Sequence, residues 1–189
     1  MNLALQKASV VQDRLDGNAV FLRPLSLDDV TANYLRWLND PEVTRFLETR
    51  HRPQTMQTIG EFVERVNASD DEFLFGIILK KDGRHVGNVK IGPVKLRHLL
   101  ADVTLLIGER DCWGQGIATD AIRTITRFGF EKLQLSKLTA SMYAGNVGSI
   151  RAYQRAGFAQ EGVRRKHYIL AGEPTDVIEL GLCADDPRS

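Results

Sequence analysis

The feature that most constrains this chain is a glycine-containing loop, residues 113–121 (WGQGIATDA), between an apolar run and a segment with helical periodicity. The run before it, residues 103–108, is typical of a buried strand. A strand, a loop and a helix in this order direct free backbone N–H groups and the positive end of a helix dipole at one point, which favours a phosphate. The glycines let the backbone approach that anion closely. The loop therefore predicts a phosphate-bearing cofactor.

Composition narrows the class of protein. The 189 residues fit one domain, and 25 Lys and Arg against 24 Asp and Glu give no support for a nucleic-acid partner. The two cysteines are too few for a disulfide framework, and the four histidines lack metal-ligand spacing with them, so no metal is predicted. The start shows no secretory pattern and the chain has no long apolar run, so we expect a cytoplasmic protein without a membrane segment.

Hydrophobic periodicity predicts the order of the elements. We expect an irregular lead over residues 1–19, one domain over residues 20–183 and a tail over residues 184–189. Strands are predicted at residues 20–24, 73–79, 86–91, 138–143, 158–170 and 175–182, with another that ends near Gly108. Helices are predicted from Ser26 to Asn39, after Thr55, after the glycine loop, and from Asn146 to Arg155 with Gly157 behind it. Because strands and helices do not alternate regularly, the predicted fold is α+β with one mixed sheet.

Three classes of phosphate site compete for the loop. A Walker A loop ends in Gly-Lys-Ser/Thr, which is absent here. A Rossmann loop reads Gly-x-Gly-x-x-Gly, but the last position is Thr119, and the next predicted strand ends in Met142-Tyr143 instead of an acidic residue. The third class is a coenzyme A site.

A second motif favours coenzyme A. Gly114-Gln115-Gly116-Ile117-Ala118, after an apolar strand, resembles the acyl-CoA pyrophosphate loop of the GNAT N-acetyltransferase superfamily. Downstream, Asn146-x-x-Ser149-x-x-x-Tyr153-x-x-x-Gly157-Phe158 is similar to the second motif of that family in residue type and spacing. Segments 22–25, 37–43 and 164–168 suit its branch of ribosomal-protein N-terminal and aminosugar-nucleotide acetyltransferases. The resemblance implies a mostly antiparallel twisted sheet of about seven strands with four or five flanking helices, and acetyl-CoA as the cofactor.

The resemblance also implies the cofactor site, where the fourth and fifth strands part. The expected cofactor-binding residues come from a strand end, the glycine loop and the second motif: Leu106, Ile107, Gly108, Gly114, Gln115, Gly116, Ile117, Ala118, Thr119, Asn146, Ser149, Arg151 and Tyr153. Many members of the wider superfamily carry Gln or Arg where this chain has Trp113, although Trp is common in the branch named above. Backbone N–H groups are therefore expected to hold most of the pyrophosphate. Asn146 is expected both to cap its helix and to contact the pantetheine arm.

Acetyl transfer to an amine requires a neutral nucleophile, a polarised carbonyl and a proton for the departing thiolate. The resemblance implies Tyr153 as the general acid, although such a tyrosine out of context would be a packed aromatic, and it implies that Ser149 contacts the cofactor or orients the thiol. The base does not carry over, because the position of the family's carboxylate is Ser141 here. Asp102 is the substitute candidate, with His85 and His98 as weaker ones. Cys112 has no base nearby in the sequence and is predicted to be structural.

The amine acceptor is the part of the predicted function that the sequence defines least. Residues between the first two helices, together with one histidine, are expected to line its pocket, although such side chains often form only a solvated face: Trp37, Asn39, Arg45, Glu48, Arg50 and His85. An α-amine, with a pKa of about 7.7–8.0, needs less help from a base than a lysine at about 10.4, which favours a protein N-terminus or an amino sugar nucleotide. A polyamine or antibiotic amine is the alternative acceptor, and a catalytically silent acyl-CoA-binding module is the alternative function. The sequence leaves the choice between monomer and homodimer open.

Overall fold

The computed structural model describes residues 14–186. Eight strands in this part of the chain form one sheet, in the order β1-β2-β3-β4-β5-β6-β8-β7. The strands are β1 (Leu15–Asp16), β2 (Val20–Pro24), β3 (Phe73–Leu79), β4 (His85–Ile91), β5 (Leu100–Ile107), β6 (Lys137–Tyr143), β7 (Ala159–Leu170) and β8 (Glu173–Cys183). All neighbouring strands are antiparallel except β5 and β6, which are parallel. The predicted mixed, mostly antiparallel sheet is therefore confirmed, with β1 as a strand beyond the seven expected.

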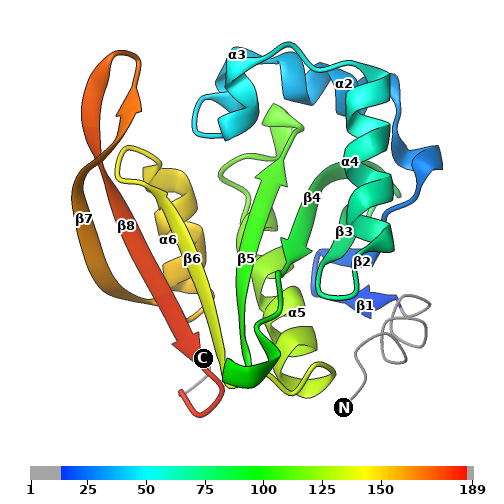
Figure 1. Cartoon of the computed structure of the whole chain (residues 1–189). Helices are drawn as coiled ribbons and strands as arrows, with labels where there is room; N and C mark the ends of the chain where they lie inside the picture. Colours follow the sequence, from blue (N-terminus) through cyan, green and yellow to red (C-terminus); the bar gives the residue numbers. More distant parts are fainter. Residues whose placement is uncertain (1–13, 187–189) are drawn as a thin grey trace.

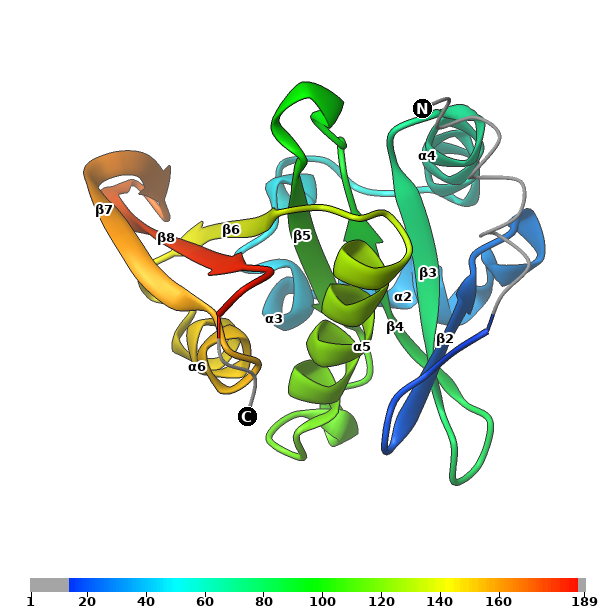
Figure 2. The same ribbon diagram turned by 90° about the horizontal axis from the view of Figure 1, so that it is seen from below.

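Helices cover both faces of this sheet. They are α2 (Ala32–Asn39), α3 (Pro41–Thr44), α4 (Met56–Ala68), α5 (Ile117–Glu131) and α6 (Val147–Arg155), with short 3-10 turns η1 (Leu27–Asp29), η2 (Glu48–His51), η3 (Leu96–His98) and η4 (Arg110–Cys112). Figure 2 shows α5 and α6 on one side of the sheet and α4 on the other. Apolar side chains of α5 and the sheet form the larger core, and those of α2 and α4 form a second core on the opposite face. No helix in residues 14–186 combines the length and apolarity needed to span a bilayer.

The predicted caps explain where several helices begin. Thr55 accepts a hydrogen bond from the backbone N–H of Thr58 at the start of α4, and Asn146 accepts one from Ser149 at the start of α6. The single helix predicted from Ser26 to Asn39 is instead divided into η1 and α2. Asp29 turns its carboxylate back to the backbone N–H of Ser26, which closes η1, and α2 then begins after a new cap, Thr31.

The N-terminal lead is more ordered than predicted from residue 14 onward. Leu15 pairs with Leu22 in an antiparallel hairpin. The carboxylate of Asp120, in the first turn of α5, accepts hydrogen bonds of 2.9, 2.7 and 3.0 Å from the backbone N–H groups of Asn18, Ala19 and Val20. This carboxylate fixes the hairpin turn to the helix. The rest of the predicted lead, residues 1–13, and residues 187–189 of the tail lie outside the described residues.

The sheet opens between β5 and β6. These strands pair only where Leu100–Asp102 faces Lys137–Thr139. Beyond Asp102, β5 continues to pair with β4 on its other edge, while β6 pairs with β8. Figure 1 shows β5 and β6 meeting at one end and diverging toward α3. The predicted parting of two central strands is therefore present, and it leaves an edge of β5 without a neighbouring strand.

Candidate functional site

A cavity of about 630 Å³ lies where β5 and β6 part, and we call it the cofactor cleft. Its walls come from the end of β5, the glycine loop with the start of α5, α6 with the residues before it, and the segment from Glu42 to Leu47. Most of the predicted cofactor-binding residues line it: Leu106, Ile107, Gly114, Gly116, Ile117, Ala118, Thr119, Asn146, Ser149 and Arg151. The two sequence motifs therefore meet in space at this cleft.

The glycine loop presents free donors to the cleft. Gly114 and Gly116 have φ values of 73° and 79°, a left-handed conformation that favours glycine. The first hydrogen bond into α5 runs from the Asp120 N–H to the Gly116 carbonyl. The backbone N–H groups of residues 114–119 have no hydrogen-bond acceptor in the part of the chain that the structure describes. These donors, at the positive end of a 15-residue helix, form a site suited to a phosphate.

The charges around the cleft reinforce this preference. Arg151 and Arg155 line it, and neither guanidinium has a hydrogen-bond or ion-pair partner among the described residues. The carboxylate of Asp111, just before the loop, is bound by Arg84 at 3.0 Å, which lowers the pKa of Asp111. Glu42 is a carboxylate on the opposite wall. The side of the cleft near α5 and α6 is therefore positive.

Two of the predicted cofactor-binding residues, Gly108 and Gln115, lie outside the lining of the cleft. Gly108 does not line the cleft; its missing side chain makes room for Trp37, because a Cβ at this position would lie 2.1 Å from the Trp37 Cδ2 atom. Gln115 also lies outside the cleft, and its side-chain amide donates to the Asp111 carbonyl. Trp113 lines the cleft and donates from Nε1 to the Ile107 carbonyl at 2.9 Å, which occupies the last carbonyl of β5.

Tyr153 lies at the base of the parting strands instead of in the cleft wall. Its side chain is buried, and its hydroxyl donates to the Val103 carbonyl at 2.8 Å. Val103 is the first β5 residue beyond the pairing with β6. Burial raises the Tyr153 pKa well above the usual value for tyrosine. The Tyr153 hydroxyl thus lies where β5 and β6 begin to part, with its proton directed at the backbone.

The other predicted catalytic residues lie on different sides of the sheet. Ser149 lines the cleft from the first turn of α6. Asp102 ends the β5–β6 pairing and accepts a hydrogen bond from the Thr139 hydroxyl across the two strands. Its neighbours Ala101 and Val103 pack in the core with α5, so strand alternation directs Asp102 to the opposite face. Cys112 is buried beside the loop, and burial raises its thiol pKa, which leaves less of the reactive thiolate.

Three predicted acceptor residues pack or bond elsewhere in the fold, away from the cleft. Trp37 is completely buried and donates from Nε1 to Glu109 at 2.9 Å, so it is a core residue. The side chain of Asn39 binds the backbone of Gln54 and holds the loop before α4. His85 packs edge-on against Trp37, and burial lowers its pKa. These positions do not support a direct contact with the acceptor.

Two of the remaining acceptor candidates, Glu48 and Arg50, bind a tyrosine that sequence reasoning missed. Arg45 lines the cleft, and Glu48 and Arg50 lie beside it on η2. The Tyr143 hydroxyl, at the end of β6, donates to Glu48 Oε1 at 2.5 Å and accepts from Arg50 Nη2 at 2.9 Å. The hydrogen bond from Tyr143 lowers the pKa of Glu48. The sequence contains one indication of a role for Tyr143, because this residue ends a predicted strand three residues before Asn146, the first residue of the second motif.

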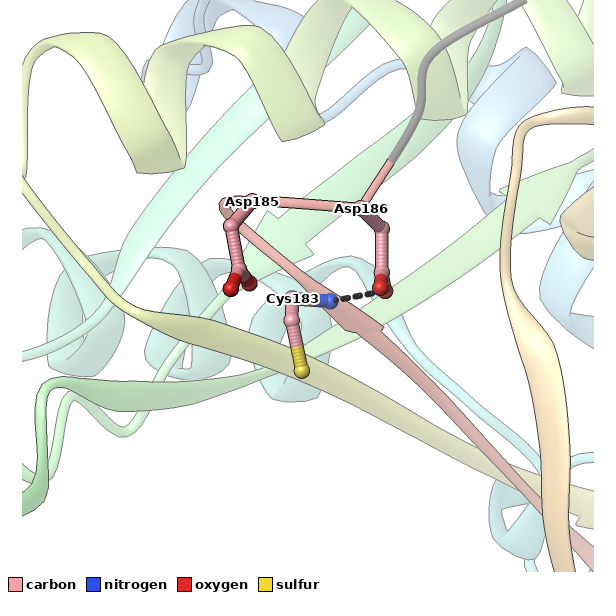
Figure 3. Close-up of side chains that lie close together, drawn as sticks. All are labelled: Cys183, Asp185 and Asp186. Carbon is pink, nitrogen blue, oxygen red and sulfur yellow. Dashed lines mark hydrogen bonds between the residues drawn. The ribbon is translucent and has the colours of Figure 1, made fainter.

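A group of potential metal ligands lies away from the cleft. Figure 3 shows Cys183, Asp185 and Asp186 at the end of β8, with one ligand atom of each within 4.8 Å of the others. The Asp186 carboxylate accepts a hydrogen bond from the Cys183 backbone N–H at 2.7 Å, which closes the turn after the strand. Cys183 pairs with Lys137 at the start of β6, whereas the cleft begins beyond its other end. The group has a structural explanation separate from the site.

Comparison with known proteins identifies the family. The acetyltransferase (GNAT) domain model matches residues 19–159. The probable N-acetyltransferase YjcK of Bacillus subtilis is 30% identical over 181 residues, which cover 91% of this chain and 98% of that protein. Spermidine N-acetyltransferase from Vibrio cholerae, solved with CoA and spermine, superposes with a TM-score of 0.79 at 18% identity, covering 89% of this chain and 97% of that one. RimJ from Mycobacterium smegmatis, solved with CoA-disulfide, gives 0.77 at 22% identity, with coverage of 92% and 87%.

The two solved structures show that this chain has the same fold as those acetyltransferases. The family model and the Bacillus relative match most of the chain in sequence as well, which shows the family. The chain belongs to the GNAT family of N-acetyltransferases, whose cofactor is acetyl-CoA.

Proposed function

We propose that this enzyme transfers an acetyl group from acetyl-CoA directly to a primary amine, and that a protein N-terminal α-amine or an amino sugar nucleotide is the preferred acceptor. The observation that carries the cofactor assignment is the row of unsatisfied N–H groups at residues 114–119, beside two unpaired arginines. Hydrogen bonds to a charged group contribute about 1.5–3 kcal/mol each. Four such bonds contribute about 6–12 kcal/mol, so contacts with the pantetheine arm are also needed to reach a micromolar Kd, about 8 kcal/mol, after association costs of about 4–15 kcal/mol.

The pantetheine arm would follow the free edge of β5. This edge begins at Val103 and runs to Ile107, and leucine side chains of the strand line the cleft. An extended amide-containing chain at such an edge forms the backbone hydrogen bonds that a further strand would form. The Asn146 side chain uses its oxygen for the helix cap, so its amide N–H₂ is the group proposed to contact the arm.

In the proposed reaction, the neutral amine attacks the thioester carbonyl carbon, the C–S bond breaks, and the thiolate acquires a proton. We assign the proton donor as Tyr153, which requires its hydroxyl to turn from the Val103 carbonyl toward the sulfur. Because burial raises its pKa, the hydroxyl stays protonated at neutral pH and can stabilise the developing negative charge. The amine loses its proton to water or to a carboxylate, for which Asp102 and Glu48 are the candidates.

The acceptor assignment rests on the amine's own acidity. The position expected for a carboxylate base is Ser141, so no strong base adjoins the motif. At pH 7 roughly a tenth of an α-amine is neutral, against about one lysine side chain in a thousand. A polyamine is the second candidate, because a structural neighbour of this chain is a spermidine N-acetyltransferase.

The test is thiol release from acetyl-CoA in the presence of N-terminal peptides, an amino sugar nucleotide or spermidine. We expect one of the first two to accelerate release most. If acetyl-CoA binds but no amine accelerates thiol release, the chain is a binding module and the proposal fails.

Tyr153→Phe tests the proton donor. We expect turnover to fall by about a hundredfold with little change in acetyl-CoA affinity. Tyr34→Phe is the matched control, because Tyr34 is also a buried tyrosine but belongs to the second core. Equal turnover in the two variants would return Tyr153 to a packing role.

A further inference from the structure

A second cavity, of about 360 Å³, adjoins the cofactor cleft, and we call it the side cavity. It lies between the β1–β2 turn, the glycine loop and the two helices that follow. Gly116, Thr119 and Arg155 line both cavities, so the two meet at the first turn of α5. The side cavity contains no part of β5 and no part of the segment from Glu42 to Leu47. It therefore continues the cleft in the direction away from the reaction site.

Two arginines from different helices converge on the side cavity. Arg123 of α5 donates from Nη2 to the Arg155 carbonyl at 2.7 Å, and this bond joins α5 to the last residue of α6. The Arg155 guanidinium has no partner among residues 14–186. Asp120 also lines the cavity, but its oxygens already accept three backbone N–H groups. The two guanidinium groups of the side cavity therefore form no ion pair with Asp120, the carboxylate that also lines it.

We propose that the side cavity binds the 3′-phosphate of the CoA adenosine, and that Arg123 and Arg155 make the enzyme prefer CoA over 3′-dephospho-CoA. The inference rests on the proposed binding of the pyrophosphate at residues 114–119. With the pyrophosphate at Gly116, the pantetheine extends toward β5 and the adenosine must leave on the other side, where the side cavity begins. A phosphate monoester carries about −1.5 to −2 charges at pH 7, and arginine matches its oxygens with a planar pair of donors.

The test compares two ligands that differ only in this phosphate. Calorimetry on the full chain measures the Kd of CoA and of 3′-dephospho-CoA, and we expect a preference of about tenfold to a hundredfold for CoA. Arg155→Ala should reduce the preference, and the double variant Arg123→Ala/Arg155→Ala should abolish it. The ratio is the readout, because Arg155 also lines the cofactor cleft and its loss weakens both ligands.

Arg127→Ala is the matched control. Arg127 lies one turn beyond Arg123 on α5, is exposed, and lines neither cavity; its guanidinium donates to the Asp16 carbonyl. The substitution removes the same charge, so a general field effect would change the preference in this variant too. We expect Arg127→Ala to retain the wild-type ratio.

The outcomes separate this inference from the proposed function. If the wild-type chain binds both ligands equally, or if the double variant keeps the preference, the side cavity does not bind the 3′-phosphate, and the proposed function stands. If neither ligand binds the wild-type chain, the proposed function itself fails. Arg155→Ala breaks no hydrogen bond or ion pair of its guanidinium in the described chain, so its melting temperature should match the wild type and exclude unfolding as the cause.

Discussion

Substituting one cleft glycine, Gly116→Ala, separates the cost of backbone strain from the loss of cofactor binding. Gly116 has φ 79°, and a Cβ there would meet no atom within 4 Å, because it would point into open space. Gly172, in the β7–β8 turn, has φ 88° and is equally open, but it lies outside both cavities. A left-handed conformation costs an alanine about 1–2 kcal/mol. Both variants should therefore lose about this much unfolding free energy, which corresponds to roughly 2–8 °C in melting temperature.

Only the cleft variant should lose cofactor affinity. The methyl group would stand in front of the N–H groups of residues 114–119, and the loss of one hydrogen bond to a phosphate costs about 1.5–3 kcal/mol, or at least tenfold in Kd. The assay is CoA titration by calorimetry alongside urea unfolding for wild type, Gly116→Ala and Gly172→Ala. Equal CoA affinity in the two variants, with both folded, would refute the assignment of the glycine loop.

Three further predictions concern separate parts of the fold. Glu48→Gln should raise the KM for the amine about tenfold with little effect on the KM for acetyl-CoA, and equal changes in both would contradict an acceptor role. Burial raises the pKa of Asp29, but hydrogen bonds from Arg23 and from a backbone N–H outweigh it and keep the pKa in the folded state below the unfolded value of about 3.9. These hydrogen bonds therefore stabilise the fold above that pH, and their contribution is lost as the pH falls through the folded pKa. Urea unfolding at pH 5 and pH 3 should therefore show a smaller loss of stability for Asp29→Asn than for wild type. Gly108→Ala should cost about 3 kcal/mol or more in urea unfolding, because the new Cβ would overlap Trp37, and wild-type stability would show that the two do not pack as described.

Local patterns were sufficient to predict the elements that form the cofactor cleft. The strand, glycine loop and helix around residues 103–121 are defined by hydrophobic periodicity and by two glycines with positive φ, and these depend on neighbours in sequence. The cap of α6 is equally local, because Asn146 binds an N–H three residues on. The resemblance to the GNAT family then predicted that these two elements meet at one cofactor site.

Contacts between distant segments could not be predicted in this way. The hydrogen bond from Tyr143 to Glu48 spans 95 residues, and those from the β1–β2 turn to Asp120 span 100 to 102. Trp37 was expected at the acceptor, yet it fills the space that Gly108 leaves open on another element. The residues that flank Trp37 and Gly108 in the sequence do not indicate this contact, because it forms only when α2 packs against the end of β5.

The short pairing between β5 and β6 gives the cofactor a thermodynamic role as well as a chemical one. Only Leu100–Asp102 and Lys137–Thr139 join the strands, so the sheet's hydrogen-bond network is nearly divided in two, with β1–β5 on one side and β6–β8 on the other. A ligand bound between these two halves would contact both of them, and its binding free energy would add to the free energy of unfolding. At a concentration of one hundred times its Kd, it would raise the unfolding free energy by about 2.7 kcal/mol. The melting temperature should therefore rise with the acetyl-CoA concentration.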